Sequence, residues 1–363
     1  MDDCSVIPEI KYSDFSQQLH NRVGSQHIPI VGTFELTMRC NLHCQHCYIP
    51  PDWRSKQQEG ELNLQEIKSI LDQVTDAGCF WLLLTGGEPL SRPDFLDIYS
   101  YAKHKGLILT LFTNGTLITP RVADYLEEWR PFNIEITLYG ATEETYENVT
   151  GIPGSYKHCR RGIELLLEHN LPLVLKTMVM KPNYHELEQM KAIADSLGVQ
   201  FRFDPVLHAA IDKSTRPISL RLTPEEVVKL EKADPVRASK WPKSLREKMT
   251  YREKDRSLYL CGAGKTSFHI DGKGRLSACI SNRKPAYDLK KGSFKDGWEI
   301  YLPKITSVEY SDGFKCGGCP IRFTCAQCPA LAETEFQNEE ERIDYICELS
   351  KLRIKEFVQK NDV

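Results

Sequence analysis

The sequence predicts an α/β fold: a partial (β/α)6 barrel of the TIM type, followed by a cysteine-rich C-terminal domain. Apolar, β-branched runs alternate with amphipathic helical patterns from about residue 31 to residue 205, and cysteines dominate beyond residue 260, where regular periodicity fades. Strict alternation of strands and helices favours parallel strands joined by helical crossovers. Six such units are too few to close an eight-stranded barrel, so we expect an open one.

Six short apolar runs are the expected strands: Thr33–Met38, Phe80–Thr85, Ile108–Thr113, Asn133–Leu138, Leu173–Met180 and Gln200–Asp204. Between them, apolar residues keep the i, i+3, i+4, i+7 spacing of a buried helix face. The clearest faces are Ile67, Ile70, Leu71 and Val74, and Met190, Ile193, Ala194 and Leu197. In barrels of this kind the chemistry gathers at the carboxyl ends of the strands, so residues that follow each run are candidates for a site.

Composition predicts four segments along the chain. Residues 1–30 precede the first strand, residues 31–210 form the barrel, and residues 211–260 are charged, mostly helical and read as a connecting segment. Residues 261–363 carry seven of the thirteen cysteines and are expected to form a separate small domain.

Charge and hydropathy exclude several classes of partner. Lys and Arg total 47 against 50 for Asp and Glu, which gives no electrostatic case for a nucleic acid or an anionic membrane. No apolar stretch approaches the length of a membrane span, and the acidic N-terminus lacks the pattern of a signal peptide. We therefore expect a cytoplasmic protein whose thiols are reduced, so that metal binding outranks disulfides. Cys4, Cys79 and Cys159 are expected to be free thiols.

Three cysteines directly after the first expected strand are the strongest signal. Cys40, Cys44 and Cys47 stand at C-x3-C-x2-C spacing in one short loop. A cubane [4Fe–4S] cluster takes four ligands, so three thiolates leave one iron open. Structural zinc sites fill four positions and commonly use repeated C-x2-C pairs, which makes this trio a poor zinc site.

A second motif, Gly86-Gly87-Glu88-Pro89, follows the second expected strand. Two glycines let the backbone approach a ligand closely, and the Glu88 carboxylate can accept a hydrogen bond from an ammonium group. The ordinary alternative is a turn, because glycine and proline are routine turn residues.

The trio and this motif, at successive strand ends, resemble the signature of radical S-adenosylmethionine (SAM) enzymes. In that family the open iron binds the amino and carboxylate groups of SAM. The resemblance implies that Gly86, Gly87, Glu88 and Pro89 hold the amino group and that His46 packs near the adenine. It also implies that Thr113, Asn114 and Thr137, at the ends of the third and fourth strands, meet the ribose, although strand-end capping explains each of these three equally well.

Two further polar residues lie in the last expected strands. Lys176 interrupts an apolar strand. It either faces the barrel interior, where it meets the SAM carboxylate or the substrate, or lies at a solvent-facing edge. Arg202 and Asp204 share one face of the sixth strand, and Asp204 is the candidate catalytic residue that orients the substrate or accepts a proton. A salt-bridge partner is the alternative role for Arg202.

The C-terminal cysteines resemble the SPASM extension of radical SAM proteins, with a final C-x2-C where that family has C-x3-C. The resemblance implies two auxiliary [4Fe–4S] clusters besides the cluster that binds SAM. The outer one is held by Cys316, Cys319, Cys325 and Cys347, and the inner one by Cys261, Cys279 and Cys328 with its fourth position open or filled by another ligand. Zinc in a knuckle of two C-x2-C pairs is the alternative.

The resemblance implies reductive cleavage of SAM to a 5′-deoxyadenosyl radical that abstracts hydrogen from the substrate. Residues 136–146 look like a stretch common in enzymes that modify ribosomally made precursor peptides, so a precursor peptide is the expected substrate. About thirty residues before the first strand are too few for a leader-binding domain, which favours a separate small leader-binding protein or a SPASM surface. A flavodoxin or ferredoxin is the expected reductant. The alternatives are tailoring of a small molecule, such as a tetrapyrrole or cofactor precursor, and a non-enzymatic metal or electron-transfer protein.

Overall fold

Six parallel strands, joined by helices, form an open barrel and confirm the predicted fold class. The structure is a computed structural model that describes residues 11–23, 26–55, 59–250 and 256–358. The strands are β1 (Val31–Glu35), β2 (Trp81–Thr85), β3 (Ile108–Thr113), β4 (Asn133–Thr137), β5 (Leu173–Met178) and β6 (Gln200–Asp204). They lie side by side in chain order, as right-handed strand–helix–strand units require.

The register of neighbouring strands aligns their carboxyl ends. Glu35 pairs with Thr85 at the end of β1 and β2, and Met178 pairs with Asp204 at the end of β5 and β6. The predicted bounds of β3 and β6 match the structure, whereas the first strand begins two residues earlier than predicted, at Val31. The alignment brings the segments that follow each strand to one edge of the barrel.

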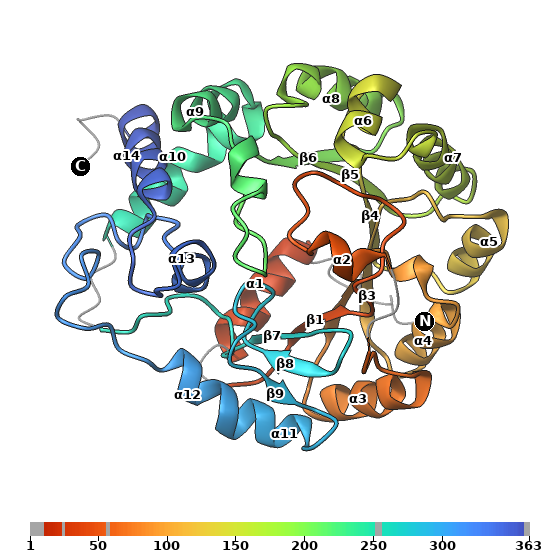
Figure 1. The fold of residues 1–363 in the computed structure, drawn as a ribbon, viewed down its shortest axis with the longest axis horizontal. Coiled ribbons are helices and arrows are strands. Elements are labelled where there is room, and N and C mark those ends of the chain that lie inside the picture. The colour runs from red at the N-terminus through yellow and green to blue at the C-terminus, as the bar shows by residue number, and fades with distance from the viewer. Residues whose placement is uncertain (1–10, 24–25, 56–58, 251–255, 359–363) are drawn as a thin grey trace, which may run out of the picture.

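Helices cover the outside of the strands. In Figure 1, the helices from α3 (Leu64–Asp76) to α9 (Pro224–Ala233) form an arc around the barrel, and the C-terminal helices lie in the gap that the arc leaves. On α3 the predicted apolar face is buried, and Asn63 and Glu66 cap its first turn reciprocally. The N-terminal and barrel helices are α1 (Tyr12–Val23), α2 (Pro51–Arg54), α3 (Leu64–Asp76), α4 (Phe95–His104), α5 (Pro120–Glu128), α6 (Glu143–Thr150), α7 (Ser155–Glu168) and α8 (Leu187–Ser196).

The C-terminal region extends the same sheet, which the sequence did not predict. Strand β7 (Ser267–Ile270) pairs in parallel with β1, and β8 (Arg275–Ser277) and β9 (Tyr287–Asp288) follow in antiparallel order. One nine-stranded sheet therefore contains strands from both sides of residue 261, where we placed a domain boundary. That boundary stays a prediction.

The segment expected to be a connector, residues 211–260, contains helices in its described part and also packs against the C-terminal helix, and its role as a connector stays a prediction. Its helix α9 contacts α14, and α10 contacts both. The remaining helices are α9 (Pro224–Ala233), α10 (Pro235–Thr250), α11 (Phe294–Asp296), α12 (Leu302–Thr306), α13 (Pro329–Phe336) and α14 (Asp344–Phe357).

The thiols of the described chain are all free. Cys79 and Cys159 are buried, as small apolar side chains are, whereas Cys4 lies outside the described residues. In the part of the chain that is described, no helix has the length and apolar character needed to cross a bilayer.

Candidate functional site

A cavity of about 730 Å³ lies at the carboxyl ends of the six parallel strands. Its walls include most of the site residues predicted from the sequence: Cys40, Cys44, His46, Cys47, Gly86, Gly87, Thr113, Asn114, Thr137, Lys176 and Asp204. Glu88 and Pro89 are buried behind the wall and do not line it. Ile280 and Ser281, which follow Cys279, and Leu331 and Thr334 of α13 also line the cavity, so it lies between the barrel and the C-terminal region.

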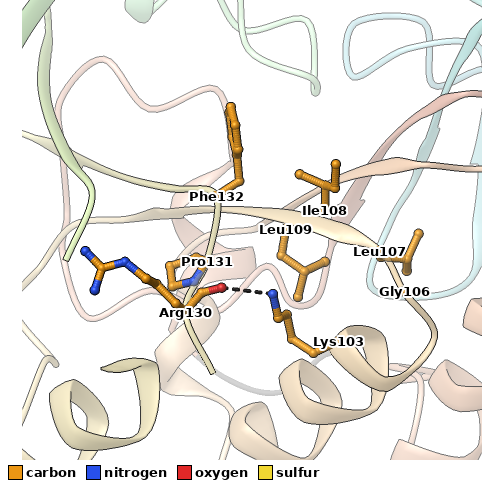
Figure 2. A pocket seen from close by; sticks show the side chains of 8 residues that line it. All are labelled: Lys103, Gly106, Leu107, Ile108, Leu109, Arg130, Pro131 and Phe132. Carbon is orange, nitrogen blue, oxygen red and sulfur yellow. Dashed lines mark hydrogen bonds between the residues drawn. The ribbon is translucent and has the colours of Figure 1, made fainter. Parts of the chain in front are cut away.

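A second, smaller cavity lies at the opposite end of the barrel, and Figure 2 shows the side chains that line it. Its volume is about 360 Å³, and residues at the amino ends of β3 and β4 line it. The Lys103 ammonium donates to the carbonyl of Arg130 at 2.9 Å, so the amine already has a partner. No residue predicted for the site lines this cavity, and it is not the candidate site.

The loop that carries the cysteine trio is fastened to two neighbouring helices. The N–H groups of His43 and Gln45 donate to the carbonyls of Thr150 and Val149 at the end of α6, at 2.8 and 3.0 Å. The N–H of Cys40 donates to the carbonyl of Arg54, the last residue of α2, at 3.0 Å. Three thiols are thus held on one wall of the cavity by the backbone.

The two glycines of the predicted motif are needed because two backbones meet there. The N–H of Gly87 donates to the carbonyl of Thr37 at 2.8 Å, and that of Glu88 to the carbonyl of Arg39 at 2.7 Å. A Cβ at Gly86 would lie 2.4 Å from the Thr37 oxygen, and one at Gly87 would lie 2.3 Å from the Arg39 oxygen. The motif therefore positions the start of the trio loop as well as lining the cavity.

The Glu88 carboxylate fixes the end of β3. It accepts hydrogen bonds from the Thr113 hydroxyl at 2.8 Å, the Asn114 N–H at 2.7 Å and the Leu90 N–H at 3.0 Å. Burial raises the pKa of Glu88 to about 7, although these three donors favour the ionised form. Contact between Glu88 and the SAM amino group stays a prediction.

The structure decides between the two positions left open for Lys176, because its side chain faces the cavity. Its ammonium lies 3.2 Å from a carboxylate oxygen of Glu135 on β4 and 2.8 Å from the ring centre of Phe112. Arg202 pairs with the same carboxylate, as its alternative role required. Burial lowers the pKa of Lys176 to about 7, against the attraction of Glu135. Sequence reasoning missed Glu135, which lies between Ile134 and Ile136 and was detectable as a lone charge in an apolar strand.

Tyr139 and His208 line the cavity next to the predicted residues His46 and Asp204. His46 packs edge-on against Tyr139, with ring centres 4.8 Å apart, and burial lowers its pKa to about 4. Asp204 accepts a hydrogen bond from the Val206 N–H at 2.9 Å, and its charge acts on the partly buried His208. His208 also lines the cavity and was missed, since nothing in its sequence surroundings marks it.

A buried cluster around Glu35 joins the barrel to the C-terminal region and was also missed. Glu35, fully buried on β1, accepts from Tyr48 at 2.5 Å and from Arg283 at 2.6 and 2.8 Å, and the His269 ring lies 3.1 Å away. Burial opposes ionisation of Glu35, but Arg283 and His269 hold its pKa well below the usual range. Tyr48 follows Cys47 and Arg283 lies four residues after Cys279, so two cysteine loops share one carboxylate.

The seven C-terminal cysteines lie in two groups. Burial raises the pKa of Cys316, and the neighbouring charges of Cys319, Cys325 and Cys347 raise it further. The second group is Cys261, Cys279 and Cys328: burial raises the pKa of Cys328 to about 11, and the other two thiols add to the rise.

The two groups have the membership that the SPASM resemblance implied, whereas their role as cluster ligands stays a prediction. Within the described residues, no three His, Cys, Asp or Glu side chains come close enough together to hold a single metal ion.

The chain is similar to several known proteins. Residues 34–194 match the radical SAM superfamily. The chain is 28% identical to the AdoMet-dependent heme synthase of Methanosarcina barkeri over 85% of its length and 94% of that protein's length. It is also 28% identical to the mycofactocin maturase MftC of Mycobacterium ulcerans, over 82% of each chain.

Solved structures show the same fold. The structure of Streptococcus suis SuiB bound to its precursor peptide SuiA superposes with a TM-score of 0.68, over 96% of this chain and 84% of that chain, at 15% identity. The match over residues 34–194 and the similarity to MftC confirm the resemblance to radical SAM proteins and peptide maturases drawn from the sequence, and SuiB shares the fold.

The superfamily implies one [4Fe–4S] cluster and SAM, and the residues present fit them. Three thiols from one loop face a cavity large enough for a drug-sized ligand, and glycines and strand-end polar groups line its adjoining wall.

Proposed function

We propose that this protein modifies a precursor peptide by radical SAM chemistry in the cavity at the carboxyl ends of β1 to β6. The cavity carries the proposal, because the thiols of Cys40, Cys44 and Cys47, the strand-end residues and the C-terminal region all line it. The cluster, when bound, supplies the electron that cleaves SAM to methionine and a 5′-deoxyadenosyl radical. The chain's task is to hold SAM and substrate in line and to exclude water.

We assign each group of cavity residues to a part of SAM or to the substrate according to its position. Gly86 and Gly87, beside the trio loop, line the part of the cavity that would take the methionine end of SAM. The Thr113, Asn114 and Thr137 side chains stand where the ribose would follow, and His46 with Tyr139 offers a buried aromatic surface for the adenine. Asp204, on the sixth strand, faces the space left for substrate and orients it or accepts its proton.

The two groups of C-terminal thiols support two auxiliary clusters. Four thiols suffice for one complete cubane, and three leave an open position on the other. Ile280 and Ser281 place the inner group beside the cavity, so we propose that the inner cluster takes up the electron that remains when the substrate radical collapses, or binds the substrate.

Similarity to MftC and to SuiB, a protein crystallised with its precursor peptide, supports a peptide substrate. Similarity to a heme synthase over 85% of the chain favours a second candidate, tailoring of a tetrapyrrole. A cytoplasmic location, a reducing flavodoxin or ferredoxin, and a separate leader-binding protein belong to the proposal as well.

Anaerobic reconstitution followed by metal counting tests the cofactors. About twelve irons per chain support three cubane clusters, and about four irons with one zinc support the knuckle. Formation of 5′-deoxyadenosine from SAM and dithionite tests the radical chemistry; its absence from iron-loaded protein would favour an electron-transfer role.

The substrate is identified by incubating the iron-reconstituted enzyme with short peptides encoded beside its gene and, separately, with iron tetrapyrroles. A mass change in a peptide supports the proposal, and a change in the tetrapyrrole alone overturns it in favour of the second candidate. Tight binding of the peptide's leader to the full chain without a helper would contradict the need for a separate leader-binding protein.

A further inference from the structure

Arg54, at the end of α2, is a buried cation without a carboxylate partner among the described residues. Its side chain is 5% exposed; one terminal nitrogen donates to the carbonyl of Cys44 at 3.3 Å, and its Nε has no acceptor. Two equally buried arginines differ, because Arg92 pairs with Asp94 and Arg353 with Glu231, each at 2.7 Å.

A buried charge that is not neutralised destabilises a folded protein strongly, so such a cation points to an anion that occupies the same region. The groups next to Arg54 are the three thiols of the trio. The guanidinium of Arg54 donates to the carbonyl of Cys44, and its charge acts on the thiols of Cys40, Cys44 and Cys47. The carbonyl of Arg54 also accepts the Cys40 N–H at 3.0 Å.

Other charged groups near the trio already have partners. The charge of Glu35 acts on Cys47, but Glu35 is paired with Arg283. The charge of Glu88 acts on Cys40, but Glu88 accepts hydrogen bonds from Thr113 and Asn114. Arg216 donates to the Cys47 carbonyl at 3.0 Å and is partly exposed, so solvent screens its charge more than that of Arg54.

We propose that Arg54 is the counter-ion of the cluster at Cys40, Cys44 and Cys47 and that it raises the reduction potential of that cluster. A [4Fe–4S] core held by thiolates is negatively charged, and one electron from an external reductant makes it more negative without forming or breaking a bond in the chain. A fixed positive charge in a poorly screened site stabilises the more negative state. The inference rests on the proposed cluster site and is independent of which substrate the enzyme takes.

The test is a redox titration followed by electron paramagnetic resonance on the reconstituted full chain, with dithionite as reductant. The signal that changes when SAM is added identifies the cluster in question. We expect Arg54→Met to lower its midpoint potential and Arg54→Lys, which keeps the charge, to restore most of the shift. Arg161→Met, which removes an exposed charge paired with Glu164 and Glu168, should leave the potential unchanged. An iron-loaded Arg54→Met protein with the wild-type potential would overturn the proposal.

Thermal unfolding of the protein with and without iron gives a second measurement. Without iron, Arg54→Met should melt no lower than the wild type, since it removes an uncompensated charge, and reconstitution should raise its melting temperature less than that of the wild type. A lower melting temperature of the iron-free variant would assign Arg54 a purely structural role.

Iron uptake separates the remaining cases. If Arg54→Met takes up no iron at the trio while Arg54→Lys does, the charge is needed and the proposal stands. If both variants fail, the hydrogen bond to Cys44 is what matters and the proposal falls. Failure of the cluster site itself is distinguishable, because the wild-type chain would then hold no SAM-responsive cluster.

Discussion

Glu35 and Arg283 form a two-point ion pair inside the protein, with oxygen–nitrogen distances of 2.6 and 2.8 Å. The pair spans 248 residues of sequence and ties β1 of the barrel to the loop after Cys279. Because Tyr48 donates to the same carboxylate, the loop of the cysteine trio and the inner C-terminal group are held in a common geometry.

Removing one member of this pair should destabilise the protein strongly. Arg283→Met leaves the Glu35 charge buried without its main partner, and we expect a loss of about 3–5 kcal/mol in the free energy of unfolding. Urea denaturation of the iron-free protein measures it, with Arg161→Met as an exposed control that loses at most about 1 kcal/mol. Glu35→Gln in the Arg283→Met background should recover part of the loss; an additive double mutant would contradict a direct coupling.

Lys176 should make stability depend on pH. Burial lowers its pKa to about 7, whereas the unfolded chain has an ordinary lysine with a pKa of about 10.4. Between these values the unfolded state binds more protons, so the free energy of unfolding rises with pH, by up to about 1.4 kcal/mol per pH unit. Lys176→Met should flatten this rise between pH 7 and 10, and Lys229→Met, at an exposed position, should keep it. Equal slopes in both variants would contradict the prediction.

Glu88→Gln should disturb the end of β3. The amide nitrogen of the new side chain would face N–H or O–H donors of Leu90, Thr113 and Asn114, so one hydrogen bond becomes a repulsive contact. We expect formation of 5′-deoxyadenosine from SAM to fall about 100-fold through misplacement of the strand end.

The same variant has a pH signature. Because burial raises the pKa of Glu88 to about 7, the folded state binds more protons than the unfolded state between about pH 4.3 and 7, and stability falls as pH rises through that window. Glu88→Gln should remove this fall, and Glu188→Gln, at an exposed site, should retain it. Unchanged SAM cleavage in Glu88→Gln would show that neither the strand end nor the carboxylate matters.

Gly87→Ala should displace the trio loop. The added Cβ would lie 2.3 Å from the carbonyl oxygen of Arg39 and 2.5 Å from that of Met38, and neither backbone atom can move without moving Cys40. We expect a loss of about 1–3 kcal/mol in stability and about four irons fewer after reconstitution. Gly313→Ala is the control, since its nearest neighbour is the Ser311 hydroxyl at 3.7 Å. Full iron content in Gly87→Ala would contradict the proposed role of the close approach.

The inner thiols should be separable from the radical-generating site. Replacing Cys261, Cys279 and Cys328 with alanine should remove about four irons and abolish the modified product, while 5′-deoxyadenosine is still formed with dithionite. Cys159→Ala, at a buried thiol outside both groups, should keep all iron. If the triple variant retained its iron, the inner cluster would have to lie elsewhere.

Much of this site follows from local sequence. The trio spacing, the Gly86-Gly87-Glu88-Pro89 motif and the strand ends at Thr113 and Asp204 are each visible within a few residues, and parallel strands bring their carboxyl ends together. Among the residues that were missed, Glu35 pairs with Arg283 across 248 residues and Glu135 with Arg202 across 67, whereas Arg54 lies ten residues from Cys44. Glu135, His208 and Arg54 are single charged or polar residues whose sequence neighbours do not say which wall they face.

Periodicity and spacing alone were enough to determine six parallel strands, the apolar faces of their helices and the cysteine trio, because these depend on neighbours along the chain. Packing decided the rest. The sheet continues from β1 into β7. Glu88 is buried with its carboxylate toward Thr113 and does not line the cavity, and Arg54 is buried against the trio without a carboxylate partner in the described chain. Burial and charge pairing depend on segments far apart in sequence, and no short pattern encodes which of them meet.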